Sequence, residues 1–143
     1  MNTFVSHSPN ETEAFAENFA KRLNPNTVIA FTGDLGAGKT CFVRGLAKGL
    51  GFTGTVNSPT FALVNEYLGG KLPLFHFDMY RISGWEDLET TGYFDYLTAG
   101  GVLAVEWSEN IENALPNDTV RIDIRQTDQN DRIITVNGFT RAD

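Results

Sequence analysis

Residues 27–40 read TVIAFTGDLGAGKT and join two kinds of secondary structure. Residues 27–32 form a continuous apolar run, which is typical of a strand buried on both faces of a sheet. The segment from Lys39 to about Leu50 then places Phe42, Leu46 and Leu50 on one stripe of a helix. The sequence therefore predicts a strand, a glycine-rich loop and a helix, which is the beginning of an α/β fold.

The loop between the strand and the helix carries the pattern G-x-x-x-x-G-K-[ST]. Its glycines permit backbone conformations that other residues avoid, and successive N–H groups beside a helix N-terminus attract phosphate oxygens. Lysine adds a positive charge for the β- and γ-phosphates, and the following hydroxyl is suited to Mg²⁺. We therefore predict a site for a nucleoside triphosphate with Mg²⁺, formed by Gly33, Asp34, Leu35, Gly36, Ala37, Gly38, Lys39 and Thr40.

Two carboxylates follow apolar runs further along the chain. Asp78 ends the run Leu74 to Asp78, and Glu106 ends the run Val102 to Glu106. Ligands of open α/β sheets bind outside the carboxyl ends of the strands, and a phosphate loop needs a further carboxylate at its metal. Either residue is therefore a candidate magnesium ligand, and the sequence does not decide which of them contacts the metal directly.

His76 alternates with two phenylalanines, so it either faces solvent or pairs with a carboxylate. We favour a structural role for it. Zinc binding is not supported, because one Cys and two His cannot form a zinc site.

The rest of the pattern predicts further elements around this centre. Phe4 to Ser6 reads as a short edge strand, and Asn10 is the expected N-cap of a helix over residues 11–23. Two strands are expected at 61–67 and 71–78, with Gly69-Gly70 as a tight hairpin turn. The remaining expectations are a partly helical segment at 83–98, a short helix at 111–115, and an antiparallel strand pair at 120–125 and 132–137.

Composition bounds the class of protein. The chain has 143 residues, 41% of them hydrophobic, which suits one domain (1–143) with a real core. The net charge of −7 argues against binding nucleic acid over the whole surface. Cys41, the single cysteine, fits a reducing compartment. The start of the chain lacks the features of a signal peptide, and no apolar run is long enough for a membrane span. We therefore expect a cytoplasmic protein without membrane attachment.

The absence of other motifs narrows the choice of nucleotide. No N-K-x-D string is present, and no D-x-x-G follows the loop, so guanine specificity lacks its usual residues. No stretch has the arginine density of the lid that small-molecule kinases carry. Adenine is the better expectation for the base, by elimination.

Five blocks of sequence together resemble the TsaE (YjeE) family, the bacterial P-loop ATPases of tRNA threonylcarbamoyladenosine biosynthesis. The resemblance runs in order from about Glu11 to about Gly138. Many families share the loop, whereas the blocks at 58–61, 76–81 and 106–107 are far more specific to this family. The blocks are GDLGAGKT (33–40), SPTF (58–61), HFDMYR (76–81), EDLE (86–89) and EW (106–107).

The resemblance implies a role for each matching residue. Lys39 would contact the phosphates and Thr40 would hold Mg²⁺, with Asp78 in the Walker B position and Glu106 at the metal or the attacking water. Thr60 would belong to a loop that responds to the γ-phosphate, and Trp107 would flank the nucleotide site. Thr12 and Arg132 would be two further nucleotide contacts. The implied fold is a P-loop NTPase-like three-layer sandwich whose mixed sheet has parallel core strands and antiparallel additions.

The implied activity is hydrolysis of ATP to ADP and phosphate, with Mg²⁺, and it would be weak in the isolated chain. The partners would be TsaB and TsaD, a heterodimer that transfers the threonylcarbamoyl group onto adenosine 37 of tRNAs reading ANN codons. The tRNA would be handled by that complex, and no membrane would be involved. Two alternatives stay open: a small-molecule kinase, and a nucleotide-dependent binding module without significant turnover.

Overall fold

The computed structural model describes residues 2–33, 38–54 and 64–138. Its centre is one seven-stranded sheet in the order β1-β7-β6-β2-β5-β4-β3. Strand β2 (Val28–Gly33) lies between β6 (Val120–Gln126) and β5 (Val102–Glu106) and runs parallel to both, while β5 is also parallel to β4 (Leu74–Asp78). The parallel core predicted around the apolar strand is therefore confirmed.

Antiparallel strands complete both edges of the sheet. Strand β7 (Arg132–Asn137) pairs with β6, and β1 (Asn2–Ser6) pairs with β7 at one edge. At the other edge, β3 (Val64–Tyr67) is antiparallel to β4. The mixed sheet with antiparallel additions, including the edge strand near the N-terminus, agrees with the prediction.

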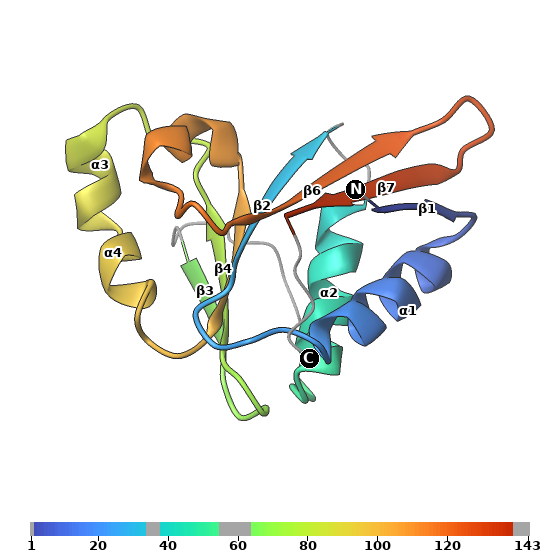
Figure 1. Ribbon diagram of the computed structural model, residues 1–143, viewed down its shortest axis with the longest axis horizontal. Helices are drawn as coiled ribbons and strands as arrows, with labels where there is room; N and C mark the ends of the chain where they lie inside the picture. The colour runs from blue at the N-terminus through green and yellow to red at the C-terminus, as the bar shows by residue number, and fades with distance from the viewer. Residues whose placement is uncertain (1, 34–37, 55–63, 139–143) are drawn as a thin grey trace.

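Helices cover both faces of the sheet, so the fold has three layers (Figure 1). Helices α1 (Pro9–Ala20) and α2 (Lys39–Gly49) lie on one side. The short helices α3 (Trp85–Thr90) and α4 (Tyr93–Tyr96) lie on the other, with the 3-10 helix η1 (Ser108–Ala114). Alternate residues of β5 divide between the two cores: Ala104 packs with the α1–α2 side and Val105 with the α3–α4 side.

Helices α1 and α2 approach each other unusually closely, because glycines stand at their contact. A Cβ atom at Gly45 would collide with the carbonyl oxygen of Glu13, and one at Gly49 would collide with that of Glu17. Helix α2 ends at Gly49, close to the end that the sequence pattern predicted, and Gly49 also permits the close packing. Gly51, with φ of 94°, follows the helix end.

Several boundaries differ from the sequence prediction; for example, the short helix expected at 111–115 is the 3-10 helix Ser108–Ala114. Helix α1 begins at Pro9 and ends at Ala20, and its N-cap is Ser8 rather than Asn10: the Ser8 side chain accepts a hydrogen bond from the Glu11 backbone N–H at 3.1 Å. Pro9 is pre-organised for the first helical position, which favours this earlier start. The β3–β4 hairpin is confirmed, but residues 68–73 form its connection, so Gly69-Gly70 is part of a longer loop.

One edge of the sheet collects the ends of most strands. Strands β2, β4, β5 and β6 finish there, and the antiparallel β7 begins there with Arg132. Strand β1 ends there too, because Ser6 is paired with Arg132, and α1 follows directly. Among the described helices, none is long and apolar enough to cross a membrane.

Candidate functional site

The described residues of the phosphate-loop motif lie where β2 gives way to α2. Gly33 has φ of 113°, and a Cβ atom there would collide with the backbone of Ile124 in the neighbouring strand, so only glycine fits. Gly38 caps α2 with φ of 105°. Lys39 begins the helix, and its Nζ donates to the Gly33 carbonyl at 3.4 Å, so the lysine side chain lies toward the end of β2. Residues 34–37 lie outside the described part of the chain.

Asp78 and Glu106 occupy paired positions in the parallel β4–β5 register, each at the last residue of its strand. The Asp78 carboxylate accepts the backbone N–H of Tyr80 at 3.0 Å, which fixes one of its oxygens. The Glu106 side chain is 18% exposed. Both residues therefore end at the carboxyl edge of the sheet, as their positions in the sequence predicted.

Both carboxylates belong to the face of the sheet that α2 covers. Side chains alternate along a strand, and Leu74 of β4 and Ala104 of β5 pack in the core with α1 and α2. Asp78 is four residues after Leu74 and Glu106 is two residues after Ala104, so both have the same orientation. Thr40 stands in the first turn of α2, the helix that covers this face.

His76 is the feature that sequence reasoning left open, and the structure resolves it. Its side chain is fully buried, and its Nε2 lies 2.5 Å from Oε2 of Glu106. The possibility that it faces solvent is thus wrong, and pairing with a carboxylate is what occurs. The only advance signal was its place in strand β4, two residues before Asp78.

Trp107 follows Glu106 in a left-handed backbone conformation, with φ of 58°. Its ring lies 4.8 Å from that of Tyr80, centroid to centroid. Asn110 donates from Nδ2 to the Met79 carbonyl at 2.9 Å, and the Met79 N–H donates to the Glu106 carbonyl at 3.0 Å. These contacts tie the segments after β4 and β5 together, which holds the ends of both strands in a fixed relation.

Thr12 and Arg132, which the sequence places 120 residues apart, line one small cavity of about 150 Å³ with Gly38. Cys41 also lines this cavity. Its Sγ donates to the Pro9 carbonyl at 3.1 Å, and burial raises the pKa of its thiol. The structure therefore brings two of the more distant predicted contacts to the N-terminus of α2. His7, Ser8 and Asn130 complete the lining, and nothing in their sequence surroundings indicated it.

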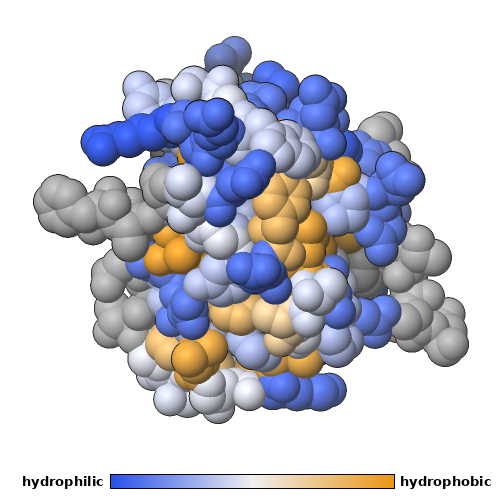
Figure 2. Space-filling view, turned by 90° about the vertical axis from the view of Figure 1, so that its left-hand side faces the viewer, coloured by the Kyte–Doolittle hydropathy of each residue, from blue (hydrophilic) through white to orange (hydrophobic). Residues whose placement is uncertain are grey.

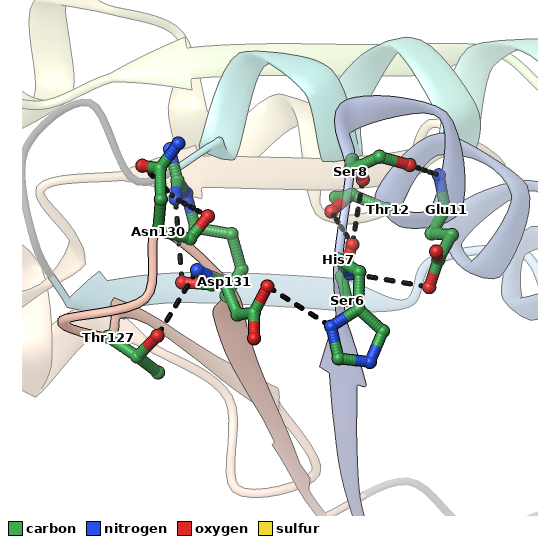
Figure 3. Close-up of polar contacts among 9 residues, drawn as sticks. Ser6, His7, Ser8, Glu11, Thr12, Thr127, Asn130 and Asp131 are labelled. Carbon is green, nitrogen blue, oxygen red and sulfur yellow. Dashed lines mark hydrogen bonds and ion pairs between the residues drawn. The ribbon is translucent and has the colours of Figure 1, made fainter.

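Polar contacts support the walls of this cavity (Figure 3). Thr12 is buried, and its hydroxyl shares a hydrogen bond of 2.7 Å with that of Ser6, at the end of β1. On the opposite wall, Arg132 donates from its guanidinium to the Asn130 carbonyl at 3.1 Å. His7 contacts Asp131 at 3.1 Å and so connects the two walls.

The remaining predicted residue, Thr60, lies outside the described part of the chain. Within the described residues, no group of three or more His, Cys, Asp or Glu side chains is arranged to hold a metal ion. A metal at this edge would therefore depend on the hydroxyl of Thr40 and on oxygens of the nucleotide, beside the two carboxylates. All of these are hard oxygen donors, which fits Mg²⁺ in a phosphate site.

These features define a three-layer α/β protein that has a phosphate-loop motif at the carboxyl edge of a mixed sheet. The family described as "Threonylcarbamoyl adenosine biosynthesis protein TsaE" matches residues 6–134, and the chain belongs to this family.

Individual relatives agree with the family match. The chain is 44% identical, over 90% of its length and 80% of the relative's, to the tRNA threonylcarbamoyladenosine biosynthesis protein TsaE of Bacillus subtilis. It is 39% identical to the protein of that name from Treponema pallidum, over 92% and 97% of the two chains. The crystal structure of B. subtilis YdiB superposes with a TM-score of 0.81 at 38% identity, covering 94% of this chain and 83% of that one.

Proposed function

We propose that this protein binds ATP with Mg²⁺ and hydrolyses it to ADP and phosphate, in support of threonylcarbamoyladenosine formation on tRNA. The observation that carries the proposal is the pairing of Asp78 with Glu106 in register, at the ends of β4 and β5, of which β5 lies next to β2. Two carboxylates next to a phosphate-loop motif are what the hydrolysis of a nucleoside triphosphate needs, because that reaction depends on positioning and electrostatics.

The phosphates would lie at the N-terminus of α2. Positive φ at both Gly33 and Gly38 turns the backbone so that N–H groups can face an anion, and the helix dipole adds to the attraction. Lys39 would exchange its contact with the Gly33 carbonyl for one with the phosphates. Because Nζ already lies beside the last residue of β2, where the motif begins, only a small side-chain movement would be required.

Mg²⁺ would be held by Thr40 together with Asp78, Glu106 or both. The bound ion would supply charge that offsets the charge of the phosphate oxygens. Asp78 has one oxygen fixed by the Tyr80 N–H, and Glu106 has one fixed by His76. Each carboxylate therefore keeps a second oxygen for a metal or a water, and either one is suited to orient the attacking water.

The cavity beside Thr12 and Arg132 would take part of the nucleoside. At about 150 Å³ it is smaller than the pockets that enclose whole ligands, so it suits one portion of a nucleotide whose phosphates extend toward Lys39. A guanidinium and a hydroxyl in one small cavity favour a polar ligand group such as a ribose or a base edge.

The pathway follows from the family and the relatives, which carry the name of tRNA threonylcarbamoyladenosine biosynthesis. Within that pathway we propose that the protein acts with the TsaB–TsaD heterodimer, which modifies adenosine 37 of tRNAs reading ANN codons. The tRNA would be contacted only through the complex. ATP turnover would be slow until the partners bind.

The distribution of charge supports a protein partner over direct contact with tRNA. Residues 82–120 contain eight Asp or Glu and no Lys or Arg, whereas the rest of the chain is nearly balanced. This segment includes α3, α4 and η1, and a surface of that sign repels a phosphate backbone.

Figure 2 shows the side of the molecule that carries α3 and α4, where apolar side chains gather between hydrophilic ones. Trp85, 56% exposed, borders a cavity of about 230 Å³ in this segment, and exposed aromatics are frequent in protein interfaces.

A phosphate-release assay tests the proposal. The protein is assayed alone, with TsaB–TsaD, and with the heterodimer plus tRNA, while threonylcarbamoyladenosine is quantified in parallel. We expect release that depends on Mg²⁺ and rises when the partners are added. The binding-module alternative predicts tight ATP binding with negligible release in every mixture. The kinase alternative predicts that labelled γ-phosphate appears on a small-molecule acceptor instead of as free phosphate.

A further inference from the structure

His76 is a fully buried polar side chain that the proposed reaction does not yet use. It lies in β4 on the face covered by α2, two residues before Asp78. Its Nε2 reaches diagonally across to β5 and lies 2.5 Å from Oε2 of Glu106. A carboxylate oxygen can only accept, so Nε2–H is the donor in this pair.

The other ring nitrogen makes burial of this histidine costly. Nδ1 is buried and has no hydrogen-bond partner among the residues that the structure describes. An unsatisfied polar atom in a core is destabilising, whereas an apolar side chain of similar size would leave none. Packing of the sheet alone therefore does not account for a histidine here. What the imidazole provides, and an apolar residue cannot, is the single hydrogen bond to Glu106.

We propose that His76 is a positioning residue for Glu106. The glutamate side chain has three rotatable bonds, and it stands only 18% exposed at the end of its strand. The hydrogen bond from His76 holds Oε2 toward the sheet and leaves Oε1 as the oxygen for the metal or the attacking water. Partners of this kind, one step behind the groups that contact a metal, fix the orientation of those groups. The inference rests on the proposed function, because it assigns Glu106 to the magnesium and water side of the site.

Two amide substitutions distinguish positioning from simple packing. The side-chain nitrogen of Gln reaches about as far as Nε2 of histidine, whereas that of Asn corresponds to Nδ1, which does not touch Glu106. His76→Gln and His76→Asn bury similar polar groups, so a purely structural role predicts similar defects. A positioning role predicts that His76→Gln retains much of the wild-type behaviour and that His76→Asn loses it.

The first measurement is binding of ATP by calorimetry, with Mg²⁺ and with EDTA, for the wild type and both variants. We expect the affinity for ATP in EDTA to be unchanged, and the gain in affinity from Mg²⁺ to fall about 10-fold or more in His76→Asn. The second is phosphate release with the TsaB–TsaD heterodimer, where kcat should fall about 10- to 100-fold in His76→Asn with little change in KM. Thermal unfolding establishes that each variant is folded.

Glu106→Gln in combination with His76→Asn completes the test. If His76 acts through Glu106, the double variant should be no worse than Glu106→Gln alone. Equal Mg²⁺-dependent affinity and kcat in the wild type and a folded His76→Asn would overturn the inference while leaving the proposed function intact. A wild type whose ATP affinity gains nothing from Mg²⁺ would overturn the proposed magnesium site, and the inference with it. If the wild type gains ATP affinity from Mg²⁺ but releases no phosphate, the proposal that it hydrolyses ATP is overturned. The calorimetric measurements still decide the role of His76 in that case.

Discussion

His7 and Asp131 lie 3.1 Å apart and join the turn before α1 to the hairpin between β6 and β7. The hydrogen bond to Asp131, together with its negative charge, raises the pKa of His7 above the ordinary value. Figure 3 shows this contact. His7 lines the cavity together with Thr12 and Arg132, and Asp131 directly precedes Arg132, so the pair links two segments that border the cavity.

A group whose pKa is higher in the folded state stabilises the fold below its unfolded pKa, which is about 6.5 for histidine. That contribution is lost as the pH rises through the higher, folded value. We therefore expect the stability of the wild type over His7→Gln to be greatest near pH 5.5 and to shrink by pH 8.5, measured by urea denaturation. His7 is exposed, so the effect is expected to be small and to weaken with added salt. A difference that grows with pH would contradict the assignment.

The N-cap of α1 gives a second prediction, because the structure and the sequence pattern name different residues. Ser8→Ala removes the acceptor for the Glu11 N–H and should cost about 1 kcal/mol in the free energy of unfolding. Asn10→Ala, at the residue that the sequence pattern favoured, is exposed within the first turn and should change stability by less than about 0.5 kcal/mol. Equilibrium denaturation of both variants decides between the two caps, and the reverse ranking would restore Asn10.

Gly45 gives a third prediction, on packing of the two long helices. A methyl group at this position would collide with the Glu13 carbonyl and the Ala16 side chain, so Gly45→Ala must push the helices apart. Overpacking of this kind typically costs about 1–3 kcal/mol, although alanine alone favours helix. Gly84→Ser is the matched control, because a Cβ atom there meets nothing within 4 Å and serine is a preferred N-cap. Thermal unfolding should separate the two, and a stabilised Gly45→Ala would show that the close contact is not rigid.

Arg132 gives a fourth prediction, on nucleotide affinity. If it contacts ATP from the cavity beside Thr12, Arg132→Ala should weaken ATP binding roughly 10- to 100-fold, as loss of a charge-assisted hydrogen bond does. Arg121→Ala is the control, since that residue is exposed and pairs with Glu112 at 2.8 Å on the surface. Calorimetric titration with Mg²⁺ and ATP measures both. Equal affinities would place the nucleoside elsewhere.

The parallel core was predictable because the local sequence pattern of its central strand agrees with the position of that strand in the sheet. The apolar run 27–32 has no polar side that could face water, and the glycine-rich motif after it fixes the direction of the chain. The β6–β7 pair showed alternation, and the short loop between its strands requires them to be antiparallel neighbours. The α1 boundary was harder to predict, because Ser8 and Asn10 are both good caps and Pro9 decides between them through its fixed φ.

The candidate site was predictable in part. Asp78 and Glu106 could be found because a carboxylate directly after an apolar strand is a recognisable pattern. That they occupy paired register positions depends on β4 and β5 being neighbours, which no local feature of either strand determines. The partnership of His76 with Glu106 is diagonal between those strands, so it also required the three-dimensional arrangement. The contacts of His7 and Asn130 depend on the meeting of segments more than 120 residues apart.

The glycine contact between α1 and α2 has a mechanical consequence. With their main chains touching at Gly45 and Gly49, the helices have no space in which to slide past one another, so they move as one body. Lys39 and Thr40 stand at the start of α2, and Thr12 stands in the first turns of α1. A shift at one of these positions is therefore transmitted to the other without any intervening loop. Edge strand β1, whose Ser6 shares a hydrogen bond with Thr12 of α1, would be displaced as well.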